Sequence, residues 1–263
     1  MFSVKQFIIH QEHCAMKVGT DGVLLGAWFE LYNIFLAPAS SKGTLAKLRP
    51  RILDIGTGTG LLALMASQRF PSARITALEL DQEACQQAKE NIDASVFSSS
   101  IEVIQGSLQD YSAEKTCKTP LFQSIICNPP YFSLSLKSPD QQRTKARHTD
   151  TLPFSSLIAK AYALLDKEGT FSLILPALEF ERFTKEIIAF NAQLDPTFYP
   201  YVLSRLCRIH PRVNGPIKRV LFTYTKTSKQ HLKPQETSLE IEVSRHTYTD
   251  DYQNLTKDFY LKM

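Results

Sequence analysis

The feature that most constrains the fold is a short apolar stretch that leads directly into three closely spaced glycines. Residues 51–55 (Arg-Ile-Leu-Asp-Ile) have the composition of a buried strand, Gly56, Gly58 and Gly60 follow, and an apolar helical run begins at Leu61. Glycine allows a positive φ and lets a ligand approach the backbone, while the first N–H groups of a helix can bind a polar group. The order of strand, tight turn and helix therefore predicts an α/β protein with a small-molecule site at the turn.

The spacing of the glycines separates two kinds of nucleotide cofactor. A dinucleotide-binding turn has the pattern G-x-G-x-x-G, whereas here the three glycines stand at alternate positions after Asp54. A second predicted strand, 74–79, ends in Glu79, and a carboxylate at such a strand end can accept hydrogen bonds from both hydroxyls of a ribose. This pattern resembles the first motif of S-adenosylmethionine-dependent methyltransferases of the Rossmann-like class. Taken alone, it also fits an ordinary strand-to-helix turn.

A second motif follows the fourth predicted strand. Residues 122–127 form an apolar run that ends at Asn128-Pro129-Pro130-Tyr131. Because α/β proteins bind ligands at the carboxyl ends of their strands, this tetrapeptide and the glycine turn should share one crevice. Each proline fixes its own φ and restricts the residue before it, which gives the Asn128 side chain and the next carbonyls defined directions. The tetrapeptide resembles that of the methyltransferases that modify exocyclic amino groups such as adenine N6.

The amino-terminal segment 14–28 makes the resemblance more specific. It contains Gly-Thr-Asp-Gly at 19–22 before an apolar helix start, and Thr20 or Asp21 is expected to cap that helix. Capping alone is a sufficient reason for these residues. The segment also strongly resembles the amino-terminal segment of bacterial tRNA1(Val) adenine N6-methyltransferases, and with the tetrapeptide it identifies the chain as a member of that family over nearly its whole length.

The resemblance implies a fold, a cofactor and a set of site residues. The fold is Rossmann-like, with a mostly parallel seven-stranded sheet and an antiparallel edge hairpin; the cofactor is S-adenosyl-L-methionine, and the target is the adenine 3′ of the anticodon. Recognition of the cofactor's adenine is expected from Ser107, Leu108 or a backbone group, because Ser107 stands where this class often has an acid. The implied catalytic residues are Asn128, Pro129, Pro130 and Tyr131, and the implied cofactor-binding residues are Lys17, Thr20, Asp21, Asp54, Gly56, Gly58, Gly60, Glu79, Leu80, Ser107, Leu108 and Asn128.

The tetrapeptide suits the chemistry of amine methylation. A nucleobase amino group is a poor nucleophile because its lone pair is delocalised into the ring. The side-chain oxygen of Asn128 and the carbonyl of Pro129 can each accept one N–H, which favours pyramidalisation and directs the lone pair toward the methyl group. Tyr131 would stack on the base, and a base already in a loop is the easiest to present. No metal and no general base are expected, so His148 is predicted to be non-catalytic.

Length and composition favour a single α/β domain with additions. The 263 residues divide into an amino-terminal segment (1–36) that is expected to line the cofactor and substrate site, a linker rich in Ser, Ala and Pro (37–50), the core (51–226) and a carboxyl-terminal strand and helix (227–263). Five cysteines without a C-x-x-C pair indicate reduced thiols, and no membrane span or signal peptide is apparent, so a cytoplasmic protein is expected. The sequence does not indicate an oligomeric state. Further helices are predicted over 61–70, 81–91, 152–165, 178–190 and after 248, and further strands over 101–104, 170–175 and 238–244.

Two basic clusters are the predicted contacts with RNA, and the formal charge of +4 suits an anionic partner. The denser cluster lies in a predicted hairpin of strands 197–208 and 217–226. The other lies in the polar stretch 133–150, for which a solvated loop is an equal alternative. The predicted RNA-binding residues are Arg143, Lys145, Arg147, Arg205, Arg208, Arg212, Lys218 and Arg219.

Other functions remain open at this point. Within the same chemistry, the tetrapeptide also occurs in glutamine-amide methyltransferases that act on release factors, and related tetrapeptides occur in guanine N2 enzymes of RNA. DNA adenine methylation is disfavoured because no obvious target-recognition domain is present in the 263 residues. From other classes, a non-catalytic RNA-binding module is disfavoured by the intact motifs, and a nicotinamide dehydrogenase by the glycine spacing.

Overall fold

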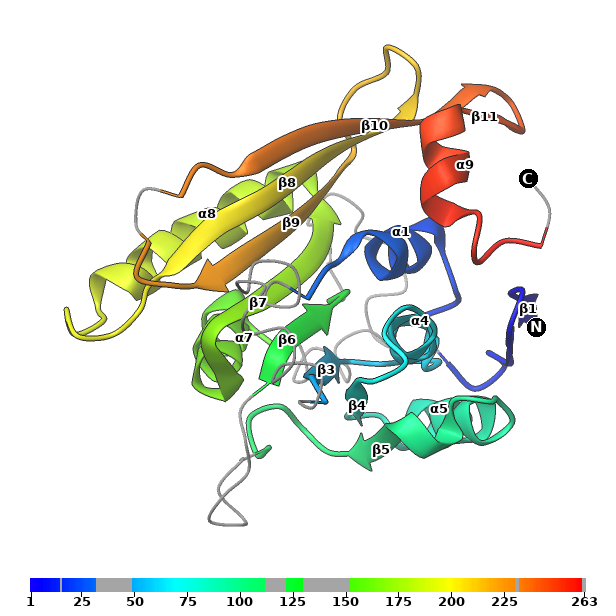
Figure 1. Cartoon of the computed structure of the whole chain (residues 1–263), viewed down its shortest axis with the longest axis horizontal. Helices are drawn as coiled ribbons and strands as arrows, with labels where there is room; N and C mark the ends of the chain where they lie inside the picture. Colours follow the sequence, from blue (N-terminus) through cyan, green and yellow to red (C-terminus); the bar gives the residue numbers. More distant parts are fainter. Residues whose placement is uncertain (15, 32–48, 112–121, 130–151, 230–231, 262–263) are drawn as a thin grey trace, which may run out of the picture.

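The computed structural model describes residues 1–14, 16–31, 49–111, 122–129, 152–229 and 232–261. Nine strands among these residues form one twisted sheet, which is the centre of the molecule (Figure 1). In chain order the strands are β3 (Arg51–Ile55), β4 (Arg74–Glu79), β5 (Ile101–Gln105), β6 (Phe122–Cys127), β7 (Leu165–Pro176), β8 (Tyr201–Arg212), β9 (Arg219–Lys226), β10 (Gln235–Ser244) and β11 (Thr247–Tyr248).

The strand order confirms the predicted Rossmann-like fold. Across the sheet it is β11-β10-β8-β9-β7-β6-β3-β4-β5. The strands β3 to β7 are mutually parallel, and β9 runs antiparallel to both β7 and β8. Among the described residues the sheet has nine strands and not the expected seven, and the hairpin is not its edge, because β10 pairs in parallel with β8 and β11 pairs with β10. A separate two-stranded sheet, β1 (Phe2–Ser3) and β2 (Ile8–Ile9), begins the chain.

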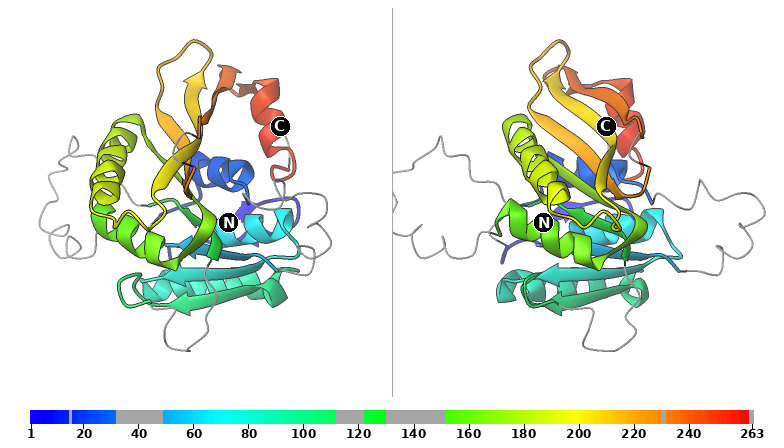
Figure 2. Two further views of the ribbon diagram at one scale, coloured as in Figure 1. Left: turned by 60° about the vertical axis from the view of Figure 1, so that its left-hand side comes forward. Right: turned by 90° about the vertical axis from the view of Figure 1, so that its left-hand side faces the viewer.

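Helices cover both faces of the sheet. Figure 2 shows α7 and α8 on one side and the helices from the two ends of the chain on the other. The two hydrophobic cores agree with this arrangement, since one combines residues of α1, α4, α5 and α9, and the other combines residues of α7 and α8. The helices are α1 (Thr20–Trp28), α4 (Leu61–Arg69), α5 (Gln82–Asp93), α7 (Phe154–Leu164), α8 (Ala177–Ala192) and α9 (Asp250–Thr256), with a short 3-10 turn at Ser98–Ser100.

Burial on both faces explains the uninterrupted apolar runs of the central strands. In β6, Ile126 belongs to one core and Ile125 to the other, and in β7 the same division holds for Ile174 and Leu173. A strand buried on both faces needs apolar residues at successive positions and does not alternate with polar ones. This two-sided burial fixes the strand ends, and with them the edge at which the site lies.

Two local predictions differ from the structure. The helix predicted to reach 165 ends at Leu164, and β7 begins at Leu165 because that residue pairs with Phe122 of β6. The expected cap of α1 by Thr20 or Asp21 is wrong, because Gly19 in extended conformation is the N-cap and no side chain caps the helix. By contrast, Asp81 caps α5 by accepting a hydrogen bond of 2.8 Å from the Ala84 N–H.

Candidate active site

The glycine turn after β3 leaves open space beside its backbone. Gly56, Gly58 and Gly60 have φ values of 69°, 57° and 83°, a region that side chains disfavour. A Cβ built at Gly56 or Gly58 meets no atom of the described residues within 4 Å, whereas one at Gly60 comes within 3.3 Å of Ile92 Cδ1. The first two glycines therefore border space that a ligand can enter, and the third lets helix α5 approach the turn.

Asp54 lies directly beneath this turn and is fully buried. Its Oδ2 accepts a hydrogen bond of 2.5 Å from the Thr57 hydroxyl, while Oδ1 has no hydrogen-bond partner of ordinary geometry among the described residues. The backbone N–H of Ala63 lowers the pKa of the carboxyl group only slightly. Burial raises the pKa of Asp54 to about 7, and the negative charge of Glu79 adds to the shift. A buried carboxylate oxygen without a partner, next to an open glycine turn, fits a ligand that carries positive charge.

Glu79 connects the end of β4 to the glycine turn. Its Oε2 accepts the N–H of Gly58 at 2.8 Å, and its Oε1 accepts the N–H groups of Leu80 and Asp81 at 2.9 and 3.0 Å. The carboxylate is half-buried, and Leu80 beside it is exposed. Glu79 therefore shapes the turn, and it also presents acceptor oxygens at the strand end where a ribose is expected.

The second motif lies at the same edge of the sheet. The parallel pairing of β3 with β6 places Cys127 opposite Ile55, so Asn128 follows β6 where Gly56 follows β3. Asn128 is half-buried, and its side chain forms no hydrogen bond with another described residue. Pro129 is buried. The structure thus brings the two motifs together, as the sequence predicts. The predicted positions Pro130 and Tyr131 lie outside the described residues.

Two acids near the glycine turn affect the pKa of Cys127, the residue just before Asn128. Burial raises the pKa of the Cys127 thiol well above its usual value, and the charges of Asp54 and Glu79 act in the same direction. Cys127 is therefore a neutral thiol at physiological pH. This influence of both acids agrees with the pairing of β3 and β6, which places Cys127 opposite Ile55 at the start of the glycine turn.

Helix α1 packs closely on α4, which brings the amino-terminal segment to the site. A Cβ at Gly22 would come within 2.9 Å of Leu61, and one at Gly26 within 2.5 Å of Met65 Sδ. A larger residue at either position would have to displace the Leu61 or Met65 side chain, and the close packing sets the start of α1 beside the start of α4, where the glycine turn ends. Lys17 and Thr20, predicted cofactor contacts, are exposed at this start.

Two of the arginines predicted to bind RNA make contacts within the protein. Arg219, at the start of β9, forms a 2.8 Å ion pair with Asp21 at the start of α1. Arg205 lies over the Trp28 ring, 4.1 Å from its centroid, and donates a hydrogen bond of 3.1 Å to the Trp28 carbonyl. Both arginines hold α1 against the sheet, one at each end of the helix.

The remaining cations of the β8–β9 hairpin are more exposed. Arg208 pairs with Glu236 at 2.8 Å, and Arg212 lies 4.0 Å from Glu242, both acids being on β10. Lys218 is exposed in the loop between the strands. The predicted RNA contacts of the other cluster, Arg143, Lys145 and Arg147, lie outside the described residues, as does His148.

The loop after β5 has an acid that the sequence analysis did not single out. The Ser107 hydroxyl donates to Asp110 Oδ2 at 2.6 Å and accepts the Asp110 N–H at 3.1 Å, which closes a small turn. Leu108 is buried, and the N–H of Gly106 binds the Glu79 carbonyl at 2.8 Å. The serine at 107 is therefore accompanied by a carboxylate three residues later, near the predicted position of the cofactor's adenine.

Asn91 is the second residue that the sequence analysis missed. It lies in the last turns of α5 and is 1% exposed. Its amide binds Thr59 of the glycine turn and His10 of the amino-terminal segment. The predicted helix 81–91 includes this position, but nothing local marks it, because its partners Thr59 and His10 lie far away in the sequence.

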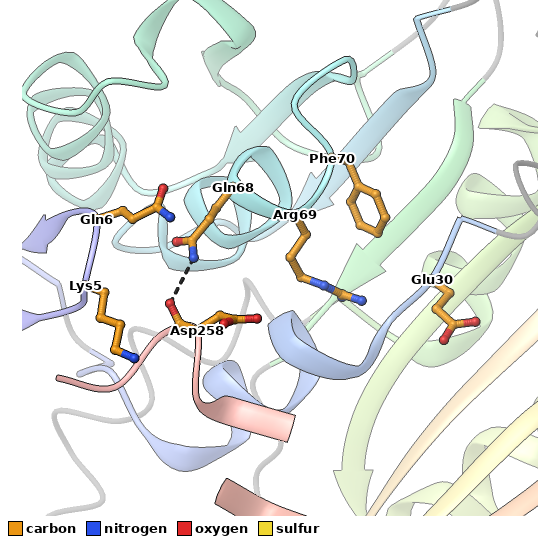
Figure 3. Close-up of a pocket in the computed structure, with 7 residues that line it drawn as sticks. All are labelled: Lys5, Gln6, Glu30, Gln68, Arg69, Phe70 and Asp258. Carbon is orange, nitrogen blue, oxygen red and sulfur yellow. Dashed lines mark hydrogen bonds between the residues drawn. The ribbon is translucent and has the colours of Figure 1, made fainter. Parts of the chain in front are cut away.

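A hollow of about 600 Å³ lies at the far end of α4, away from the glycine turn (Figure 3). It contains none of the predicted site residues, and its one drawn hydrogen bond joins Gln68 to the Asp258 carbonyl at 2.9 Å. Within the described ranges, there is no cluster of three metal-ligating side chains and no helix that could cross a membrane. The hollow is lined by Lys5, Gln6, Glu30, Gln68, Arg69, Phe70 and Asp258.

The strand order and the glycine turn define a Rossmann-like methyltransferase. In fold, the chain is similar to the crystal structure of a predicted O-methyltransferase from Agrobacterium tumefaciens, with a TM-score of 0.58 and 21% identity over 90% of this chain and 96% of that one. The sequence matches the family described as Methyltransferase small domain over residues 42–182.

The chain belongs to the family of tRNA1(Val) (adenine(37)-N6)-methyltransferases. A member from Vibrio campbellii is 42% identical over 262 residues, covering all of this chain and 96% of that protein. One from Bacteroides fragilis is 44% identical, covering all of this chain and 98% of that protein. The predicted family, and with it the prediction of an enzyme that uses S-adenosylmethionine, is confirmed.

Proposed function

We propose that this enzyme transfers a methyl group from S-adenosylmethionine to N6 of adenine 37, next to the anticodon of tRNA1(Val). The observation that carries the proposal is the placement of Asn128 and Pro129 at the end of β6, one strand away from the glycine turn. The printed function of the relatives in Vibrio campbellii and Bacteroides fragilis supports the same target. A tRNA substrate also favours the cytoplasm as the place of action.

The cofactor would be held by the residues around the glycine turn. Gly56 and Gly58 border the open space, Glu79 offers its carboxylate to ribose hydroxyls, and Asp54 offers a buried negative charge to a cationic ligand. When bound, S-adenosylmethionine supplies a methyl group that is activated by attachment to a sulfonium. The predicted contacts of Lys17, Thr20, Leu80 and Leu108 complete this set of proposed residues.

Asn128 and Pro129 would orient the amino group of the adenine. Two acceptors, the Asn128 side-chain oxygen and the Pro129 carbonyl, bind its two N–H groups and direct the nitrogen lone pair away from the ring. The stiffness of the Asn-Pro unit keeps both acceptors in place during the reaction, so the site is preorganised for the transition state. Tyr131 is proposed to stack on the extruded base.

The exposed cations of the β8–β9 hairpin are the proposed contacts with the tRNA backbone. Arg208, Arg212 and Lys218 are accessible there, whereas Arg205 and Arg219 are engaged with α1. Arginine side chains beside a site that takes a flipped base would bind phosphates and so position the anticodon stem-loop. Arg143, Lys145 and Arg147 are proposed to extend this contact.

The direct test is methylation of an unmodified tRNA1(Val) transcript, followed by mass-spectrometric mapping of the product nucleosides. The expected result is N6-methyladenosine at position 37 and no product from a transcript with guanine at that position. Methylation of a release factor, or of adenines elsewhere in the transcript, would refute the proposed target while leaving the chemistry intact.

The role of Asn128 has its own test. Asn128→Ala should slow single-turnover methyl transfer about 10²–10³-fold, the usual cost of deleting one preorganised polar group, while tRNA and cofactor affinities change less than about threefold. Full-rate transfer by this variant would remove Asn128 from the mechanism. An equal loss of tRNA affinity would show that it holds the base in the ground state.

A further inference from the structure

The amide of Asn91 joins two segments that lie far from each other in the sequence. Its Nδ2 donates to the Thr59 carbonyl at 2.9 Å and to the His10 carbonyl at 2.8 Å. Its Oδ1 accepts the His10 N–H at 2.9 Å. An asparagine amide has two N–H donors, and here both are used on backbone carbonyls. The side chain therefore pairs with His10 as a neighbouring strand would, while it also fixes the Thr59 peptide between two glycines.

The segment attached in this way closes on itself beyond His10. The Gln11 side-chain oxygen accepts a hydrogen bond of 2.8 Å from the Val18 N–H, and the Gln11 backbone carbonyl accepts one of 2.5 Å from the Lys17 ammonium group. We call residues 10–14 and 16–18 the N-terminal strap. One end of the strap is held by Asn91, and the other leads into the start of α1.

The strap lies near the acid of β4. Cys14, in the middle of the strap, is 5% exposed. Burial raises the pKa of its thiol to about 11, and the negative charges of Glu79 and Asp81 contribute to the shift. The hydrogen bonds place the strap there too, because Asn91 joins it to Thr59 while the Glu79 carboxylate accepts the N–H of Gly58 in the same turn.

Helix α5 approaches the glycine turn on the same side. The Cβ position of Gly60 is 3.3 Å from Ile92 Cδ1 and 3.5 Å from the Ala88 carbonyl. Asn91 lies between these two residues in the sequence, so its amide is delivered to the turn by a tightly packed helix. Helix α5 therefore packs against the glycine turn, and Asn91 of this helix attaches the strap to the same turn.

We propose that Asn91 is a positioning residue that holds the N-terminal strap against the glycine turn, so that the strap forms one wall of the cofactor site. The inference rests on the proposed function, because it takes the glycine turn as the place where S-adenosylmethionine binds. Loss of the Asn91 side-chain amide would leave α5 packed against the turn but would release the strap. The cofactor would then lose the protein contacts that the strap provides beside its ribose.

The helix offers a matched control at Gln87. This residue is 3% exposed, and among the described residues its side chain hydrogen-bonds only to Glu90 of the same helix, at 3.4 Å. Asn91→Leu and Gln87→Leu each replace a buried amide of α5 by an apolar side chain. Only the first of them cuts the link between the strap and the turn.

The experiment measures the binding of S-adenosylhomocysteine by isothermal titration, together with thermal unfolding and the rate at which iodoacetamide alkylates Cys14, mapped by peptide mass. Asn91→Leu should weaken binding about tenfold, the scale of one to two neutral hydrogen bonds, and should speed Cys14 alkylation by at least as much. Gln87→Leu should stay within about threefold of the parent in both. A purely structural role would lower the unfolding temperature of Asn91→Leu with the affinity unchanged, and that result would overturn the inference.

A measurement on the unchanged protein keeps the test valid if Asn91→Leu fails to fold. Saturation with S-adenosylhomocysteine should slow hydrogen exchange in peptides that cover the strap and in those that cover the glycine turn. Slowing at the turn alone would show that the strap is not part of the site. A parent protein that does not bind S-adenosylhomocysteine would overturn the proposed function itself, so the two failures are distinguishable.

Discussion

Replacement of Glu79 by alanine tests the link between the glycine turn and the cofactor. The carboxylate accepts three backbone N–H groups, from Gly58, Leu80 and Asp81, at 2.8 to 3.0 Å. Leu80 and Asp81 are exposed, so water can replace their hydrogen bonds in the variant. Gly58 is half-buried, and its N–H loses a charge-assisted partner that defines the turn.

The expected loss in cofactor affinity follows from these contacts. The two proposed charge-assisted hydrogen bonds to ribose hydroxyls would be lost in Glu79→Ala, and no other side chain of the motif would replace them. Allowing for competition with water, the variant should bind S-adenosylhomocysteine about 1.5–3 kcal/mol more weakly, or roughly 10-fold to 150-fold. Isothermal titration measures this directly. Glu79→Gln should fall between the two proteins, because its amide keeps one acceptor oxygen and loses the charge.

A nearby acid controls for the general effect of removing negative charge. Glu83 lies in the first turn of α5, is exposed, and has no hydrogen bond to the turn among the described residues. Glu83→Ala should bind the cofactor as the parent does. The reasoning is refuted if Glu79→Ala binds within twofold of the parent, or if Glu83→Ala loses as much affinity as Glu79→Ala.

Further predictions concern the buried acid and the basic hairpin. Because Asp54 has a pKa of about 7 and a cationic ligand favours its charged form, affinity for the sulfonium S-adenosylmethionine should fall by up to about tenfold per unit as pH drops below about 7. Titration at several pH values should show no such fall in Asp54→Asn. Charge reversal at Arg208 and Arg212 should weaken tRNA binding and lower its salt dependence by about one unit of slope per lost phosphate contact, with cofactor affinity unchanged. The double variant Glu236→Gln with Glu242→Gln should instead tighten tRNA binding, because it frees the two arginines. An unchanged salt dependence in both double variants would place the RNA contact elsewhere.

The features that the sequence predicts correctly are those whose cause is local. The strand before the glycines, the turn itself and the strand before Asn128 each occupy a few consecutive residues, and both strands are apolar because both of their faces are buried. Because parallel strands have their carboxyl ends at one edge of the sheet, Gly56 and Asn128 lie on adjacent strand ends. The site edge is therefore readable from two short motifs.

The features that the sequence does not reveal depend on distant partners. Arg205 binds the carbonyl of Trp28, 177 residues away, and Arg219 binds Asp21, 198 residues away. Neither partner is marked by spacing or composition, so both arginines read as surface charge. The same reason hides Asn91, whose contacts reach His10 from a helix that looks ordinary in pattern.

The parallel pairing of β10 with β8 changes the meaning of the basic hairpin. In sequence the hairpin is the densest group of cations, but the register places Glu242 of β10 opposite Arg212 of β8. Ser238 lies opposite Arg208, and Glu236, two residues before Ser238, projects from the same face of β10. The acids of β10 therefore lie beside the arginines of β8. Ion pairs at such exposed positions stabilise the fold little. In the proposed contact with tRNA, however, these acids would compete with phosphate for the same guanidinium groups. The strength of that proposed contact would then depend on β10 as much as on the arginines themselves.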